Sequence, residues 1–310
     1  MTPSTHIPVL YHEVLQLLQP QPNGRYLDAT LGAGGHAAGI LQVSAPTGRV
    51  LAFDRDPEEI TFARQQLAPY GDRVTYINDS YAEMGRLAPA NGFEALDGIL
   101  LDLGLSSRQL QNAERGFSFM QDGPLDMRFD PTQGETAADL INNLSEAELA
   151  DIFWRYGEER RSRRLARAIV NNRPFTNTRQ LADLVAAQVK GRERIHPATR
   201  IFQALRIATN HELEAVETGI PAAIGLLKPG GRIAVISFLS LEDRFVKQLF
   251  RRLSQSCTCP PQQPICTCGG KATLRLVTRK AVKASETEIQ QNPRSRSARL
   301  RVAEKISTGE

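Results

Sequence analysis

Hydrophobic positions along the chain form short runs that alternate with stretches of helical spacing. The runs at residues 25–30, 49–53, 74–77 and 96–103 predict strands, and the last, Leu-Asp-Gly-Ile-Leu-Leu-Asp-Leu, is almost continuously apolar. A parallel strand that is covered on both faces has this composition. Pro57 begins a predicted helix that continues to Leu67, with Ile60 and Ala63 at helical spacing. Strands that alternate with helices predict an α/β fold with a doubly wound parallel sheet.

The alternation stops after Asp102 and returns only near residue 198. A gap of this length is too long for a connection within a compact domain. We therefore predict one α/β domain in two parts, residues 1–105 and 209–310, with a helical domain inserted at 106–208. Within the insert, residues 104–134 predict an ordered loop, Ser145 and Glu148 predict a capping box, and helices are expected at 162–171 and 179–190.

The pattern of the sheet resumes in the last third of the chain. It predicts a helix in two parts over 198–227, a turn at 228–231, a strand at 232–238 and a helix at 241–253. The segments 273–278 and 298–305 predict strands at the edge of the sheet.

Composition excludes several classes of protein. With 41% hydrophobic residues the chain can bury a large core, so disorder is excluded as its main state. Its apolar runs are far shorter than the roughly 20 residues that a membrane helix needs. Residues 1–18 show no basic segment ahead of an apolar one, so no secretory signal is expected and we predict a cytoplasmic protein.

Charge is distributed unevenly along the chain, although the net charge is only +4. Lys and Arg number 9 against 20 Asp and Glu in residues 1–149, 13 against 5 in 150–210, 6 against 5 in 211–270 and 10 against 4 in 271–310. Basic segments beside an acidic body indicate a surface for a polyanion. For Arg160 to Arg164, an ordinary solvated helix face is the equal alternative.

All four cysteines lie close together, as Cys257, Cys259, Cys266 and Cys268. Four thiolates can bind zinc tetrahedrally, but the Cys-x-Cys spacing is not the usual Cys-x-x-Cys of a zinc knuckle. We expect reduced thiols in a surface loop and no metal, with zinc as the alternative.

A glycine turn follows the first predicted strand, and it is the first sign of a binding site. The segment 32–37, Gly-Ala-Gly-Gly-His-Ala, fits a dinucleotide-binding pattern, and Asp54 lies at the distance along the chain expected of a ribose-binding carboxylate. An NAD-dependent oxidoreductase and a methyltransferase that uses S-adenosylmethionine both fit these residues. Asp28 just before the turn favours the methyl donor, because its ammonium group needs a carboxylate there. An RNA-binding module without enzymatic activity is a third interpretation.

Six motifs then narrow the choice: Asp-Leu-Gly-Leu-Ser-Ser at 102–107, Glu-Arg-Gly-Phe-Ser-Phe at 114–119, Gly-Pro-Leu-Asp-Met-Arg at 123–128, His-Pro-Ala-Thr-Arg at 196–200, Ser-Leu-Glu-Asp-Arg at 240–244 and Asn-Pro-Arg-Ser-Arg-Ser at 292–297. In this order, from His6 to Glu304, the chain resembles the RsmH (MraW) family of bacterial 16S rRNA (cytosine-N4)-methyltransferases. One position departs from the family, which usually has histidine where this chain has Leu239.

The resemblance implies a Rossmann-like class I methyltransferase sheet interrupted by an inserted helical, basic substrate-recognition domain. It implies S-adenosyl-L-methionine as the methyl donor and, as partner and acceptor, a cytosine in the decoding region of 16S rRNA of the small ribosomal subunit. It leaves the oligomeric state open, a homodimer included. The donor site carried over by motif consists of Gly34, Gly35, His36, Asp54, Tyr81, Asp102 and Gln109.

Asp102 is the expected catalytic residue, because its carboxylate or neighbouring backbone carbonyl groups can polarise the acceptor amine. Three donor-site residues have plain structural alternatives: a core tyrosine for Tyr81, a solvent-facing start of a helix for His36, and a surface amide for Gln109.

Other residues are candidates for RNA contacts. Arg115 and Arg128 can contact phosphates or bases, with pairing inside the domain as the equal alternative. Residues 293–296 are expected to contact RNA backbone. Trp154 and Tyr156 are predicted in the helical core, whereas Phe117 and Phe119 fit either a core or a base-stacking role.

Overall fold

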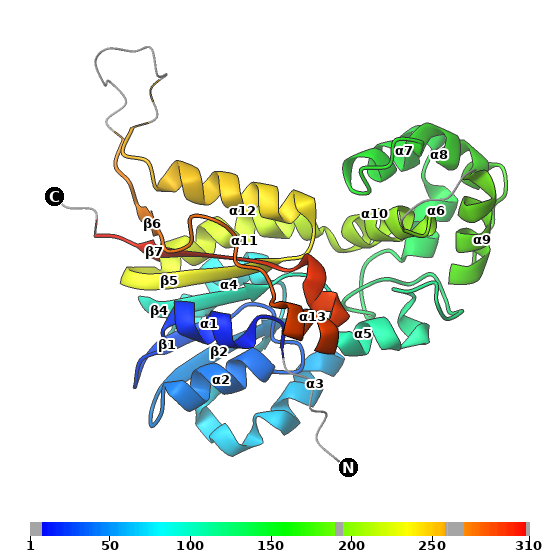
Figure 1. Cartoon of the computed structure of the whole chain (residues 1–310). Coiled ribbons are helices and arrows are strands. Elements are labelled where there is room, and N and C mark those ends of the chain that lie inside the picture. Colours follow the sequence, from blue (N-terminus) through cyan, green and yellow to red (C-terminus); the bar gives the residue numbers. More distant parts are fainter. Residues whose placement is uncertain (1–7, 190–194, 258, 260–269, 308–310) are drawn as a thin grey trace. The chain divides into compact units, whose positions relative to one another are not determined.

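A computed structural model describes residues 8–189, 195–257, 259 and 270–307. The chain divides into two compact units (Figure 1). The first unit contains residues 1–104 and 215–310, and the second contains residues 105–214. The second unit ends later than the predicted insert, because helix α10 (Ala198–Asn210) packs against α6, α7 and α9 of that unit.

The first unit is built on one seven-stranded sheet of order β3-β2-β1-β4-β5-β7-β6. Its strands are β1 (Arg25–Asp28), β2 (Arg49–Asp54), β3 (Val74–Asn78), β4 (Leu96–Asp102), β5 (Leu227–Ser237), β6 (Leu274–Leu276) and β7 (Arg299–Lys305). Strands β1 to β5 are parallel, whereas β7 is antiparallel to both β5 and β6. The predicted strands are therefore confirmed, but of the two near the C-terminus only β6 lies at the edge of the sheet, because β7 lies between β5 and β6.

Helices cover both faces of this sheet (Figure 1). They are α1 (Tyr11–Leu18), α2 (Gly35–Val43), α3 (Pro57–Gln66), α4 (Met84–Ala90), α11 (Glu212–Leu226), α12 (Ser240–Leu253) and α13 (Glu286–Gln291), with short 3-10 turns η1 (Ala68–Arg73), η2 (Tyr81–Glu83) and η4 (Pro293–Ser297). Alternate strand residues enter two separate cores. Leu27, Leu51 and Ile99 pack with α4, α11 and α12, while Tyr26 and Val50 pack with α1, α2 and α3.

The predicted turn at residues 228–231 is wrong as a separate element, because these residues belong to β5. They form an irregularity in the strand: Leu227 pairs with Leu96, Arg232 pairs with Gly98, and the register shifts between the two pairs.

The second unit consists of helices around its own core. They are α5 (Ser107–Gln111), α6 (Ala137–Asn143), α7 (Glu146–Arg155), α8 (Ser162–Val170), α9 (Thr178–Gln188) and α10, with a 3-10 turn η3 (Ala113–Arg115). The predicted capping box is present, since the Ser145 hydroxyl accepts the Glu148 N–H and the Glu148 carboxylate accepts the Ser145 N–H. Phe153, Leu165 and Ile201 are fully or almost fully buried in this core.

Candidate functional site

The glycine turn lies where the order of the strands reverses. Strand β1 is followed in the chain by β2 on one side, and its other neighbour is β4. In open α/β sheets, ligands bind outside the carboxyl ends of the strands at such a point. Gly34 has φ +84°, a left-handed conformation that disfavours side chains. A Cβ on Gly35 would lie 2.5 Å from a ring carbon of Pro8, so the turn is also packed against the N-terminal segment.

Asp28, Asp54 and Asp102 end the three adjacent strands β1, β2 and β4. Because the carboxyl ends of parallel strands lie at one edge of a sheet, the structure brings these three carboxyl groups to the same edge as the glycine turn. All three were singled out from the sequence.

Asp54 links β2 to the glycine turn. Its carboxylate accepts the Gly32 N–H at 2.7 Å and the Asp56 N–H at 2.9 Å. Asp56 caps helix α3 by accepting the Glu58 N–H, so Asp54 is not needed for that role. Each carboxylate oxygen can accept a second hydrogen bond, which leaves Asp54 able to bind a hydroxyl group.

His36 begins helix α2 beside Asp102. Its Nε2 lies 3.7 Å from Asp102 Oδ2, and its ring stacks on that of Tyr11. The His36 side chain is 6% exposed, so the alternative of a solvent-facing residue is wrong. Burial lowers the pKa of His36 to about 4, with a smaller opposing effect from the Val9 backbone, and the ring is therefore neutral at pH 7.

The carboxyl groups have raised pKa values. Burial raises the pKa of Asp28 to about 7 and that of Asp54 to about 7, and hydrogen bonds from backbone N–H groups only partly offset it. Burial raises the pKa of Asp102 to about 8, and the negative charges of Asp28 and Glu242 add to this. The shared cause is the cost of placing negative charge away from water and near other carboxylates.

Polar atoms in this group have no hydrogen-bond partner among the described residues. They are Asp28 Oδ2 and Asp102 Oδ1. Since buried polar groups in proteins are almost always paired, these atoms indicate a ligand that supplies partners. A cationic ligand fits best, because it would also favour the ionised form of both carboxyl groups.

Two further residues support the group and were not singled out from the sequence. Thr30 Oγ1 accepts the Asp102 N–H at 2.6 Å, which ties the end of β4 to the loop after β1. Glu242 is 2% exposed and accepts the N–H groups of Phe238 and Leu239 at 3.0 Å. The capping rule for sequences looks for Ser, Thr, Asp or Asn three residues before a Glu, and Leu239 occupies that position.

Tyr81 and Gln109 lie in different surroundings. Tyr81 is half-buried, packs against the core on the α11 side, and its ring fills the space where a Cβ on Gly219 would be. Gln109 belongs to the second unit, where it is 5% exposed and forms a capping box with Ser106 at the start of α5. The alternative of an exposed surface amide is therefore wrong for Gln109.

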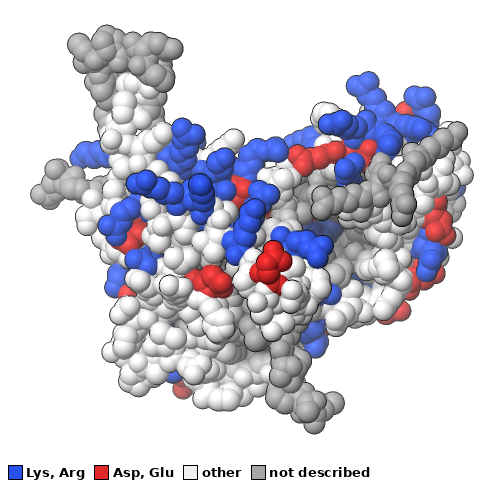
Figure 2. All heavy atoms as spheres, viewed as in Figure 1, with Lys and Arg blue, Asp and Glu red and all other residues white. Residues whose placement is uncertain are grey.

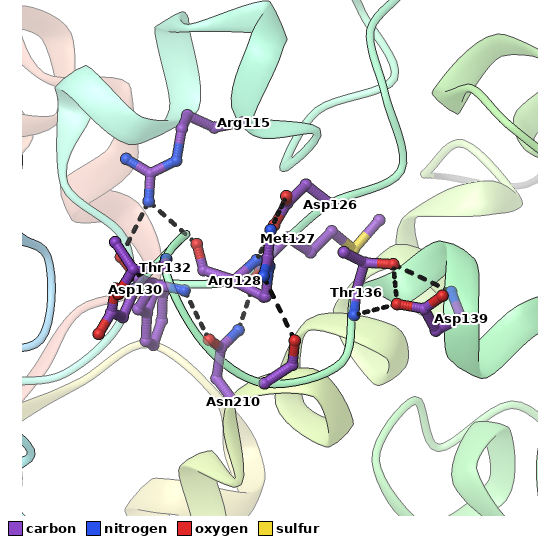
Figure 3. Close-up of polar contacts among 11 residues, drawn as sticks. Arg115, Asp126, Met127, Arg128, Asp130, Thr132, Thr136, Asp139 and Asn210 are labelled. Atoms are coloured by element: carbon purple, nitrogen blue, oxygen red, sulfur yellow. Dashed lines mark hydrogen bonds and ion pairs between the residues drawn. The ribbon is translucent and has the colours of Figure 1, made fainter.

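Arg115 and Arg128 both take part in polar contacts inside the second unit (Figure 3). Arg115 Nη2 donates to the carbonyl oxygens of Arg128 and Phe129, both at 2.9 Å. Arg128 forms a two-pronged ion pair with Asp126, and Asn210 of α10 donates to Met127 O and accepts the Phe129 N–H. Pairing within the domain is thus the alternative that the structure confirms for both arginines.

The aromatic residues that lie in the core of the second unit are not all the ones predicted. Trp154 is 57% exposed, so its predicted place in the core is wrong. It lies on the outer side of α7, next to Phe153, which takes the core position. Phe117 and Phe119 both pack in or against the core, and Tyr156 is half-buried with its hydroxyl bonded to Glu214.

The cysteine cluster is only partly described. Cys257 is exposed and Cys259 is half-buried, whereas Cys266 and Cys268 lie outside the described residues. Within the described ranges, no three His, Cys, Asp or Glu side chains are arranged to hold a metal ion. The zinc alternative stays a prediction.

Among the described residues, no helix is both long and apolar enough to cross a membrane.

The seven-stranded sheet, with the glycine turn and three carboxyl groups at one edge, has the Rossmann-like fold of methyltransferases whose cofactor is S-adenosyl-L-methionine. Residues 3–306 match the MraW methylase family, and the chain belongs to this family. The fold class expected from the sequence is confirmed.

Two relatives share about half of the sequence. The chain is 54% identical to a protein of Thermomicrobium roseum called "Ribosomal RNA small subunit methyltransferase H", over 98% of this chain and 94% of the relative. It is 52% identical to a protein of the same description from Geobacter sulfurreducens, over 97% of this chain and 99% of the relative. Among solved structures, an rRNA methylase from Streptococcus thermophilus is 11% identical, with a TM-score of 0.44 and coverage of 98% and 100%.

Proposed function

We propose that this protein transfers a methyl group from S-adenosylmethionine to the exocyclic N4 amine of a cytosine in the decoding region of 16S rRNA. The observation that carries the proposal is the pair of unpartnered carboxyl oxygens on Asp28 and Asp102, beside the glycine turn. The family membership and the names of the relatives, which specify small-subunit rRNA, support the acceptor.

Different residues of the first unit bind different parts of the methyl donor. Asp28 pairs with the ammonium group of the amino-acid tail, and Asp54 accepts hydrogen bonds from the ribose hydroxyls. Gly34 and Gly35 allow the backbone to approach the ligand closely. Tyr81 contributes its ring to the adenine, and the resemblance to the family adds His36. When bound, S-adenosylmethionine supplies an electrophilic methyl carbon.

Asp102 acts on the acceptor. The lone pair of a cytosine amine is delocalised into the ring, so a catalyst must orient the amine and accept its hydrogen bonds. As the N–C bond forms and the S–C bond breaks, the nitrogen gains positive charge and must lose one proton. Asp102 Oδ1 has no partner among the described residues, and a bound cationic donor would favour the ionised form of this carboxyl group, which is the form that can accept the proton. His36, whose Nε2 lies 3.7 Å from Asp102 Oδ2, is neutral at pH 7 and therefore supplies no positive charge to this carboxyl group.

Recognition of RNA is assigned to the second unit. Arg160, Arg163 and Arg164 are exposed at the start of α8, in agreement with an expected basic surface. Figure 2 shows Lys and Arg side chains gathered over the region of α7 and α8. Phosphate contacts of this kind position an RNA without reading its sequence.

Donor binding should depend on pH. Asp28 and Asp102 have raised pKa values, about 7 and about 8, so in the free protein they are largely protonated below pH 7. A cationic ligand binds their ionised forms, and affinity for S-adenosylmethionine should therefore rise from pH 5.5 to pH 7, by up to about tenfold per pH unit for each linked carboxyl. Isothermal titration over this range, where the ligand's ammonium stays protonated, measures the slope.

The matched control for this titration is Asp28→Asn. It should weaken binding and reduce the slope by about one proton, because one of the linked carboxyl groups is absent. A dissociation constant that does not change with pH in the unaltered protein would contradict the assignment of these carboxyl groups to a cation.

The acceptor is tested by mass spectrometry of 16S rRNA from a strain that lacks this protein. We expect loss of one methyl group from a cytosine of the decoding region, and its return when the gene is restored. Loss at another nucleotide, or at a uridine or a purine, would disprove the proposed acceptor.

A further inference from the structure

Helix α12 has a solvent face that carries only positive charge. Its inner side, formed by Val246, Leu249 and Phe250, is buried against the sheet. Its exposed residues are Ser240, Arg244, Lys247, Gln248, Arg251 and Arg252. We name Arg244, Lys247, Arg251 and Arg252 the α12 basic face.

The two acidic residues of this helix are buried and do not pair with Lys247, Arg251 or Arg252 in the part of the chain that the structure describes. Asp243 is 7% exposed and pairs with Arg299 and Arg301 of β7. Glu242 is 2% exposed and accepts backbone N–H groups. Lys247, Arg251 and Arg252 form no ion pair within the part of the chain that the structure describes.

Helix stability alone does not account for this arrangement. Arg251 and Arg252 lie in the last turn, where cations interact favourably with the helix dipole. Lys247 lies in the middle of the helix, three residues after Arg244 and four before Arg251. Like charges at these spacings repel one another by a few tenths of a kcal/mol per pair. A partner with negative charge would remove that repulsion.

The positive charge continues from α12 onto neighbouring segments of the same unit. Arg299 of β7, which bonds Asp243 of α12, has a side chain that is 46% exposed. Arg294 and Arg296 are exposed in η4, directly before β7. In Figure 2, Lys and Arg side chains gather over the α12 and β7 region of this unit.

The composition of this surface indicates which kind of polyanion it fits. The exposed large hydrophobic residues among those described are Val43, Met120, Trp154 and Ile195, and none of them lies on α12 or β7. A membrane-binding helix inserts apolar side chains, and the centre of a protein interface is rich in aromatic residues. Cations without an apolar anchor suit the phosphate backbone of a nucleic acid.

We infer that the α12 basic face is a second RNA-docking surface, located on the catalytic unit itself, which holds the phosphate backbone of the substrate RNA. The inference rests on the proposed function, because it takes small-subunit rRNA as the partner. The α12 basic face contacts phosphates and does not distinguish one base sequence of the RNA from another. These phosphate contacts increase the affinity of the protein for rRNA, and this part of the affinity does not depend on the second unit.

The test compares two triple variants of the full chain that remove the same charge. One is Lys247→Gln/Arg251→Gln/Arg252→Gln, and the other is Arg25→Gln/Arg64→Gln/Arg86→Gln, which alters exposed cations elsewhere on the same unit. Binding of 16S rRNA from a strain that lacks the protein is measured at several salt concentrations. The α12 variant should bind at least tenfold more weakly at 0.1 M salt, about the loss for three phosphate contacts, and the slope of log K against log salt should fall by about 2.

The controls separate this inference from the proposed function. The α12 variant should keep the S-adenosylmethionine affinity, the melting temperature and the rate at saturating RNA of the unaltered protein. Equal loss in both triple variants, or no loss in either, would overturn the inference. So would weaker binding to intact small subunits with unchanged binding to free rRNA, since the partner would then be a protein. If the unaltered protein binds rRNA but transfers no methyl group to it, the proposed function is wrong. The difference in rRNA affinity between the two triple variants can still be measured in that case.

Discussion

Replacing Asp102 with Ala should abolish methyl transfer to 16S rRNA in a protein that stays folded. Asp102 Oδ1 is the unpartnered carboxyl oxygen at the end of β4, and no other described carboxyl group at this edge combines that position with a pKa of about 8. Loss of a group that orients the amine and accepts its proton should lower the rate at least about 1000-fold. Incorporation of labelled methyl groups into rRNA from a strain that lacks the protein measures the loss.

Asp102→Asn is the second variant, because it keeps the shape of the side chain and removes its ability to ionise and to accept a proton. It should be inactive as well. The raised pKa of Asp102 means that the folded protein holds this proton more tightly than the unfolded chain, so its contribution to stability is present below pH 4 and is lost as pH rises through about 8. The melting temperature of the Asn variant, relative to the unaltered protein, should therefore be higher at pH 9 than at pH 5. Activity within tenfold of the unaltered protein would refute the role of Asp102.

Replacing Arg115 with Met should lower the free energy of unfolding by about 2–4 kcal/mol. The Arg115 side chain is 6% exposed and donates to the carbonyl oxygens of Arg128 and Phe129, which would lose that donor in the variant. The ordered loop of residues 112–130 depends on these contacts (Figure 3). Chemical denaturation followed by circular dichroism measures the difference.

Arg179→Met is the matched control for Arg115, since Arg179 is an exposed arginine at the start of α9 in the same unit. Its free energy of unfolding should stay within about 0.5 kcal/mol of the unaltered protein. If Arg115→Met were as stable as this control and instead weakened rRNA binding, Arg115 would be an RNA-contact residue and the structural role would be wrong.

The parallel strands could be predicted because strands covered on both faces must be almost wholly apolar. An apolar run such as residues 96–103 can therefore be recognised as a strand from a single sequence. The turn at 228–231 was misplaced for a physical reason: Gly230 and Gly231 favour a turn, but the pairing of Leu227 with Leu96 extends β5 past them. Trp154 was misplaced because helical spacing identifies a buried face without deciding which of two adjacent aromatic residues occupies it.

The carboxyl groups of the candidate site were predictable for a similar reason. Asp28, Asp54 and Asp102 each directly follow apolar residues of a strand, and the sheet topology brings the strand ends together. Glu242 could not be found in this way, since it is distant in sequence and reaches the group from the start of α12. The neutral state of His36 could not be predicted either, because it depends on burial beside Tyr11.

The central pairing of the sheet has a consequence for synthesis of the protein. Strand β4 ends at Asp102, and its partner β5 begins only at Leu227, after the whole second unit. On the ribosome the second unit, whose core is local in sequence, can fold while one side of β4 is still exposed and hydrophobic. Pairings between distant segments form slowly and leave strand edges open to aggregation. We therefore expect the edge of β4 to stay open to aggregation during translation until β5, which ends at Ser237, has emerged.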